Sequence, residues 1–199
     1  MSDKLHPIRS TLSFLAAMTV LTGVAYPALL LGIGQAVFPV QANGSLISLR
    51  GQQRGSFLLA QKFESPRFFR PRPSASDFAY IGASPSNLGP TSAALAQAVS
   101  DRRAAWVKAF GGTPESVPAD MLYSSGSGLD PDISLEAALA QVPSVAAARG
   151  LAPDSRDALV AEIKARAAKS KSLVGPERIN VVSLNVLLES DPVFSGSGK

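Results

Sequence analysis

Two groups of residues in this chain of 199 have types and spacing that could do chemistry. The run Ser125-Gly126-Ser127-Gly128 precedes a predicted helix, where its backbone N–H groups could hold a phosphate. It lacks the lysine that a G-x-x-x-x-G-K-[ST] loop needs, and the spacing alone favours a flexible turn. Asp120, Asp130 and Asp132 could share acid–base work or bind a hard cation. Carboxylates beside prolines and helix starts are more typical of helix caps.

Other catalytic arrangements are restricted by composition. The chain has no cysteine, which excludes disulfides, thiolate metal sites and a cysteine nucleophile. Its single histidine, His6, stands next to an apolar stretch without neighbouring ligand residues. The Ser-Lys pairs in Lys169-Ser170-Lys171-Ser172 resemble a solvated surface, whereas Ser-Lys catalysis needs a buried lysine. Nothing in these residues alone indicates an enzyme, and an anchored partner subunit fits better.

The strongest element is an uncharged N-terminal stretch. Between Arg9 and Arg50 there is no Asp, Glu, Lys, Arg or His. A bilayer core of about 30 Å needs about 20 apolar residues in a helix, and this stretch exceeds that length. We therefore predict a transmembrane helix over residues 11–40. The alternative is a cleaved secretory signal, since Val40-Gln41-Ala42 resembles a cleavage site, but a signal's apolar region is only about 7–15 residues long.

Small residues and a proline interrupt the predicted span. Pro27 is expected to kink the helix because proline cannot donate a backbone hydrogen bond. Gly23 and Gly32 leave flat places where a second transmembrane helix could approach. The alternative is that glycine and proline are simply common in membrane helices.

The flanks of the span suggest its orientation. A short basic N-terminal tail before the first apolar helix favours an inside N-terminus, and long domains are translocated with little regard to charge. We expect a cytoplasmic tail over residues 1–10 and an extracytoplasmic domain over residues 41–199.

The predicted domain mixes helices and strands, and its fold class is α+β: one N-terminal transmembrane helix followed by a compact mixed α/β extracytoplasmic domain. Strands are predicted at residues 44–49, 57–60 and 178–182, with an extended piece at 118–123. Helices are predicted from a cap at Thr91 or Ser92 to about 109, and at 134–141, 143–150 and 154–169, with a last turn or helix at 183–188. Residue 143 is proline, which is why the helix before it is expected to end there.

The segment from Pro66 to Pro90 is irregular and contains five prolines and several aromatic residues. Structureless loops longer than about 15 residues are unusual and often functional. Its cluster of Arg67, Arg70 and Arg72 suggests an anionic neighbour, such as lipid headgroups or acidic side chains. An ordinary solvated loop explains the same charges equally well.

Several short pieces, taken in order, resemble the C subunit of the Kdp-type potassium-transporting ATPase of bacteria. They include Gly44-Ser45-Leu46-Ile47, Phe68-Phe69-Arg70, Ser86-Asn87-Leu88-Gly89-Pro90, Ser125-Gly126-Ser127-Gly128-Leu129-Asp130-Pro131, Gln141-Val142-Pro143 and Asn180-Val181. The chain departs from the family at Ala60, where a glycine is usual, at Ala83-Ser84-Pro85 and at Gly175-Pro176-Glu177-Arg178.

The resemblance implies a non-catalytic subunit of a high-affinity, ATP-driven potassium uptake pump. A channel-like subunit then carries K⁺ and a P-type ATPase subunit hydrolyses ATP, while the C subunit assembles the complex and acts as a catalytic chaperone that raises ATP affinity. It implies no tightly bound cofactor, with ATP shared with the ATPase subunit at most. The nucleotide-contact residues it implies are Ser125, Gly126, Ser127, Gly128 and Leu129. An exterior domain cannot reach cytosolic ATP, so stabilising the assembly would have to raise affinity by shifting conformer populations.

Partner surfaces follow from the same resemblance and from the span. The expected docking residues are Gly23, Pro27, Gly32, Phe68, Phe69, Arg70, Asn87, Gly89 and Pro90. Membrane lipid and a small single-span subunit are further expected neighbours, nucleic acid is not, and the expected location is the bacterial inner membrane. The alternative function is a membrane-anchored extracytoplasmic hydrolase or binding protein.

Overall fold

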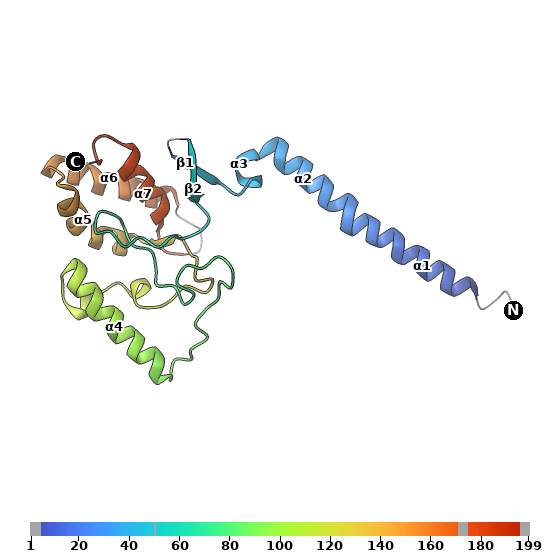
Figure 1. Cartoon of the computed structure of the whole chain (residues 1–199), viewed down its shortest axis with the longest axis horizontal. Coiled ribbons are helices and arrows are strands. Elements are labelled where there is room, and N and C mark those ends of the chain that lie inside the picture. Colours follow the sequence, from blue (N-terminus) through green and yellow to red (C-terminus); the bar gives the residue numbers. More distant parts are fainter. Residues whose placement is uncertain (1–4, 50, 171–174, 196–199) are drawn as a thin grey trace. The chain divides into compact units, whose positions relative to one another are not determined.

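The computed structural model describes residues 5–49, 51–170 and 175–195, and the chain divides into two compact units, Met1–Arg54 and Gly55–Lys199. Residues 1–4 of the expected tail, and Lys171 and Ser172 of the Ser-Lys run, lie outside the described residues. The elements of the first unit are α1 (Leu5–Val20), a π-helical turn (Leu21–Ala25), α2 (Tyr26–Val37), α3 (Pro39–Ala42) and β1 (Leu46–Leu49), with β2 (Gln52–Ser56) at the boundary (Figure 1). The elements of the second unit are α4 (Ala93–Phe110), short 3₁₀ turns at Pro114–Ser116 and Ala119–Met121, β3 (Asp132–Ser134), α5 (Leu135–Arg149), α6 (Pro153–Lys169), β4 (Arg178–Asn180) and α7 (Val181–Ser190).

The first unit contains one helix, Pro7–Val37, long and apolar enough to cross a membrane, with a mean hydropathy of 1.9. Its polar side chains bond within the helix. The Thr22 hydroxyl donates to the carbonyl of Met18 at 2.7 Å, and that of Thr11 donates to the carbonyl of Pro7 at 2.8 Å. Such bonds lower the cost of hydroxyl groups in an apolar environment.

The irregularity expected at Pro27 takes the form of the π-helical turn that precedes it. Proline has no N–H for the carbonyl of Gly23, and its ring crowds that carbonyl. In the wider turn, the N–H of Tyr26 instead donates to the carbonyl of Leu21, five residues back. The helix then continues as α2, with Pro27 in its first turn (Figure 1).

The second unit is built around α5, which packs against α4, α6 and β3. The fully buried side chains of α5 are joined in the core by Leu159 and Ile163 of α6 and by Leu184 and Leu188 of α7. β3 and β4 pair as antiparallel strands with Ile133 opposite Ile179, both buried. This mixture of helices and strands agrees with the predicted α+β class, while the extracytoplasmic placement stays a prediction.

Helix starts follow local side-chain chemistry. The side chains of Ser92, Ser134 and Asn180 each accept a hydrogen bond from the backbone N–H three residues later, as N-cap residues do. The predicted start of α4 at Ser92 is confirmed. The predicted helix 154–169 is also confirmed, and α6 begins one residue earlier, at Pro153.

The predicted break at Pro143 is wrong, because α5 runs through it as one helix. Pro143 lies on the exposed side of α5, where water can satisfy the carbonyl that loses its N–H partner. Val142 and Val145 on the opposite side are buried and hold both halves of the helix in the core.

Three predicted extended pieces also differ. Residues 57–60 are a turn after β2, closed by the N–H of Ala60 donating to the carbonyl of Leu129 at 2.9 Å. Residues 119–121 form a 3₁₀ turn that buries Met121. β4 ends at Asn180, because the Asn180 side chain caps α7 and starts the helix at Val181.

Candidate functional site

The segment between β2 and α4, residues 57–92, has no regular helix or strand, as Figure 1 shows. We call residues 57–78 its anchored half and residues 79–90 its exposed half. Buried polar side chains of α5 and α7 fix the backbone of the anchored half. These contacts determine what the segment can present to another molecule.

Asn185 of α7 is the first anchor, and it is 3% exposed. The N–H of Phe69 donates to Asn185 Oδ1 at 2.8 Å, and Asn185 Nδ2 donates to the Phe69 carbonyl at 2.9 Å. The side-chain amide therefore does for Phe69 what a neighbouring strand would do.

Gln141 of α5 repeats this arrangement for the next residue. The N–H of Arg70 donates to Gln141 Oε1 at 2.7 Å, and Gln141 Nε2 donates to the Arg70 carbonyl at 3.2 Å. Because Gln141 is fully buried, its amide has no water to replace these partners.

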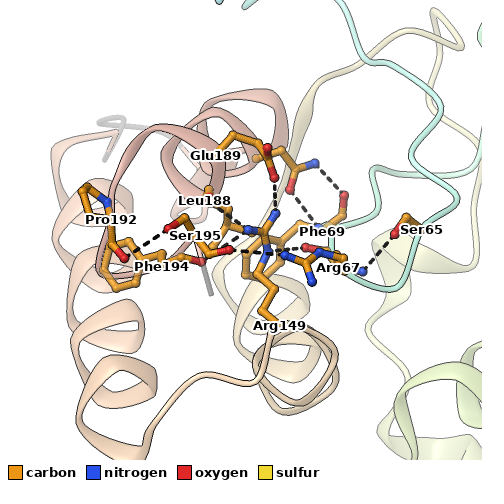
Figure 2. A network of polar contacts seen from close by, with 10 residues as sticks. Ser65, Arg67, Phe69, Arg149, Leu188, Glu189, Pro192, Phe194 and Ser195 are labelled. Carbon is orange, nitrogen blue, oxygen red and sulfur yellow. Dashed lines mark hydrogen bonds and ion pairs between the residues drawn. The ribbon is translucent and has the colours of Figure 1, made fainter. Parts of the chain in front are cut away.

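Arg149, near the end of α5, is the third anchor, and its side chain is fully buried. It donates to three backbone carbonyls, those of Arg67 at 2.7 Å, Leu188 at 2.8 Å and Phe194 at 3.3 Å (Figure 2). It also forms an ion pair with Glu189 at 2.7 Å, and its guanidinium lies 5.1 Å from the centre of the Phe68 ring. A buried arginine keeps its charge, so these acceptors are what makes its burial tolerable.

The anchored backbone changes the expectation for Phe69, whose side chain is 0% exposed and part of the core. Its predicted place in a docking surface is wrong, because another protein cannot reach it in this fold. Phe68 and Arg70 are half-buried and still reach the surface.

The exposed half differs from the anchored half in the solvent exposure of its residues. Residues 79–90 are all exposed, including Asn87, Gly89 and Pro90 of the predicted docking surface. Ile81 is 96% exposed and Tyr80 57% exposed, although both side chains are largely apolar. Single exposed apolar residues are common, but contiguous ones are typical of surfaces that another molecule covers, and Tyr80 and Ile81 are adjacent in the chain.

Ser125-Gly126-Ser127-Gly128-Leu129 lies against the anchored half. The N–H groups of Ser125, Gly128 and Leu129 donate to Pro73, to Ser125 and to the Ser127 hydroxyl. Gly128 has φ +71°, and a Cβ there would lie 2.7 Å from the Ser76 hydroxyl. Gly126 and Ser127 are exposed, and a Cβ at Gly126 would meet nothing within 4 Å.

The aspartates act within the domain. Asp120 accepts from the N–H of Ser134 at 2.7 Å and from its hydroxyl at 3.0 Å, and Asp130 pairs with Arg72 at 2.9 Å. Burial, followed by the nearby charge of Asp130, raises the pKa of Asp132. Among the described residues, no group of three or more His, Asp or Glu side chains is placed to hold a metal ion.

The residues expected to dock in the span are exposed within their own unit. A Cβ added at Gly23 or Gly32 would meet nothing within 4 Å, and Pro27 is exposed. These three positions are therefore accessible on the surface of the helix within the first unit.

The anchors were missed as functional positions by the sequence reasoning. The available signal was a polar residue on an otherwise apolar helix face. Asn185 lies among Val181, Leu184 and Leu188, which are all buried. Spacing could place Asn185 in the core, but it could not identify Phe69 as its partner, because 116 residues separate the two.

Comparison with known proteins gives consistent matches over nearly the whole chain. The model of the family described as "K+-transporting ATPase, c chain" matches residues 8–190. Proteins named potassium-transporting ATPase KdpC subunit are similar to this chain. The one from Pseudomonas entomophila is 44% identical over 183 residues, covering 92% of this chain and 94% of its own. Those from Rhodospirillum rubrum and Geobacter sulfurreducens are 43% and 42% identical, covering 93% and 92% of this chain and 96% and 97% of their own.

Proposed function

This chain belongs to the KdpC family of C chains of K⁺-transporting ATPases, and on that premise we propose that it is the non-catalytic subunit that assembles and stabilises the potassium uptake complex. Its transmembrane helix and the exposed half of the 57–92 segment are the surfaces that would bind the channel-like subunit and the P-type ATPase subunit. Membrane lipid would surround the rest of the helix.

The observation that carries this proposal is the contrast between a fixed backbone and exposed apolar side chains. Asn185, Gln141 and Arg149 hold residues 67–70 in one conformation. The chain that follows presents Tyr80 and Ile81 to solvent. A surface that is ordered before binding loses less conformational entropy when a partner covers it.

We place the domain outside the cytoplasm, with the N-terminus inside. The absence of cysteine from the sequence allows a clean test of this topology. Ser100 is an exposed residue of α4, so Ser100→Cys introduces one accessible thiol. In intact cells, the thiol of the Ser100→Cys variant should react with a membrane-impermeant maleimide. Labelling only after the cells are lysed would overturn the exterior placement.

We further propose that the subunit raises the ATP affinity of the ATPase subunit without touching ATP. Three N–H groups of the Ser125–Leu129 loop already donate within the domain, which leaves few for a phosphate. A subunit that binds one conformer of its partner more tightly shifts the population toward it, and the partner's ligand affinity follows.

Direct nucleotide contact is the second candidate, because Gly126 and Ser127 are exposed. Gly126→Ala distinguishes the two, since the added methyl group fits the fold yet would obstruct a phosphate against the loop. Indirect action predicts an unchanged KM for ATP of the assembled pump. A raised KM with normal assembly would favour direct contact.

Assembly itself is tested by removing the anchor. Deleting residues 1–42 should abolish co-purification of this chain with the other pump subunits, while Gly126→Ala should co-purify normally. Recovery of an intact complex with the shortened chain would remove the role proposed for the helix.

A further inference from the structure

A groove of about 470 Å³ opens in the second unit between α4 and the anchored half of the 57–92 segment. Its α4 wall consists of Arg102, Ala105, Trp106 and Phe110. Three of these residues, Arg102, Trp106 and Phe110, are spaced four apart and therefore share one face of the helix.

The floor of the groove is aromatic and apolar. The rings of Trp106 and Phe110 are 4.4 Å apart, and Met121 closes the floor beside them. Trp106 is 8% exposed and Met121 is 4% exposed, so the floor is recessed below the surface. A recess of this kind accommodates an apolar side chain better than a flat, mobile surface does.

Two arginines beside this floor have no acidic partner among the residues that the structure describes. Arg102 donates to the carbonyl of Leu122 at 2.8 Å and to the Ser124 hydroxyl at 3.0 Å, both neutral acceptors. The guanidinium of Arg70 lies 5.3 Å from the centre of the Phe110 ring. Both half-buried charges are thus held in place without a carboxylate.

The other two cations of the groove are neutralised. Lys62 pairs with Asp77 at 2.9 Å and with Glu64 at 3.5 Å, and Arg72 pairs with Asp130 at 2.9 Å. The uncompensated charge is therefore confined to Arg70 and Arg102, which lie next to the aromatic floor. Guanidinium groups in a fixed position recognise carboxylates through paired hydrogen bonds.

We propose that this groove binds an acidic segment of another subunit of the pump, with a carboxylate at Arg70 and Arg102 and a neighbouring apolar side chain over Trp106 and Phe110. The inference rests on the proposed function, because it takes the partner to be a subunit of the same complex. An acidic protein segment is favoured over a lipid headgroup because the aromatic floor is recessed, whereas headgroups are met by exposed, flexible basic side chains.

Arg70→Gln tests the carboxylate site with little risk to the fold. Gln141 holds the backbone of residue 70, so the side chain can change while that anchor remains. The matched control is Arg156→Gln on α6, whose arginine is exposed and pairs with its neighbour Asp157 at 3.6 Å. The measurement is the dissociation constant of the full chain for a pump preparation that lacks this subunit.

Arg70→Gln should weaken this association about tenfold, as expected for the loss of one charged pair at an interface. Arg70→Lys should recover part of the affinity, and Arg156→Gln should not change it. Equal affinities for Arg70→Gln and the wild type would overturn the proposal. Failure of the wild-type chain to associate at all would instead contradict the proposed function.

A photo-crosslinking amino acid in place of Ala105, which is exposed on the groove wall, identifies the occupant in the assembled complex. The expected product is a crosslink to a stretch of another subunit that contains Asp or Glu, reduced by Arg70→Gln. Crosslinking to lipid, or to a protein stretch without acidic residues, would overturn the assignment.

Discussion

The anchored and exposed halves of the 57–92 segment are both irregular, yet they differ in what surrounds them. In the anchored half, Phe69 is fully buried and its backbone is bonded on both sides to Asn185. In the exposed half, every residue from 79 to 90 is exposed, and Ile81 extends almost entirely into solvent.

The difference shows that a segment without secondary structure can be either fixed against the core or exposed to solvent, and this loop contains both kinds. In the anchored half, side-chain amides and a guanidinium satisfy backbone groups of Arg67, Phe69 and Arg70, and the Phe69 side chain belongs to the core. The exposed half instead presents Tyr80 and Ile81 to solvent. Substitutions of Phe69 or of the side chains that anchor its neighbourhood should therefore affect folding, and those in the exposed half should affect assembly.

The largest effect is expected from Arg149→Met. Methionine keeps the length of the side chain but leaves the carbonyls of Arg67, Leu188 and Phe194 without their donor. The expected loss is about 3–5 kcal/mol in the free energy of unfolding. Urea unfolding of the detergent-solubilised chain, followed by the fluorescence of its single tryptophan, measures it. A loss no greater than that of Arg156→Met would contradict the role of Arg149.

Asn185→Ala should have the next largest effect. It leaves the N–H and carbonyl of Phe69 buried without partners, at a cost of about 2–3 kcal/mol. The same unfolding measurement applies. If the variant were as stable as the wild type, the anchored half would not depend on this amide.

Asp132→Asn should act in the opposite direction, and the stability difference from the wild type should develop only as pH rises above about 3.8. Burial and the charge of Asp130 raise the folded-state pKa of Asp132 above its ordinary value of 3.8. The folded protein then binds this proton more tightly than the unfolded chain, so stability falls as pH rises from about 3.8 through the raised pKa.

Asparagine has no proton to lose there. The stability of Asp132→Asn relative to the wild type should increase across that interval and stay constant above it. Unfolding curves collected from pH 3.5 to pH 7 measure the difference. A difference that does not vary with pH would show that Asp132 titrates alike in the folded and unfolded chains.

Ile81→Ser should have the smallest effect on stability and a clear one on assembly. The side chain is 96% exposed, so the unfolding free energy should change by no more than about 0.5 kcal/mol. Co-purification with the other pump subunits should fall. Normal recovery of the complex would show that the exposed Ile81 side chain does not take part in docking. The assignment of assembly to the exposed half would then be wrong.

Local features were accessible to sequence reasoning. The cap at Ser92 involves atoms only three residues apart, and the length of the apolar stretch before Arg50 can be read directly from the sequence. The failures needed information from elsewhere in the fold. Pro143 is tolerated because its side of α5 is exposed. Which side is exposed depends on where α4 and α6 pack against α5, and a local stretch of sequence does not contain that information.

The candidate site was predicted only as a region. Its extent was visible in the prolines and aromatic residues between positions 66 and 90. The burial of Phe69 was not, because an aromatic residue in a loop has the same appearance whether it enters the core or faces a partner. Only the position of Asn185 in the fold decides between these outcomes.

The anchors also fix the order of events in biogenesis. A ribosome releases residues 67–69 long before it has made Asn185, which binds the backbone of Phe69 in the finished domain. It also releases them before it has made Leu188 and Phe194, whose carbonyls accept hydrogen bonds from Arg149, the side chain that binds the Arg67 carbonyl. Until these residues appear, water must solvate that stretch, and the nascent domain stays open. A premature stop codon that removes Asn185 and the residues after it would therefore be as damaging as a lesion in the middle of the core.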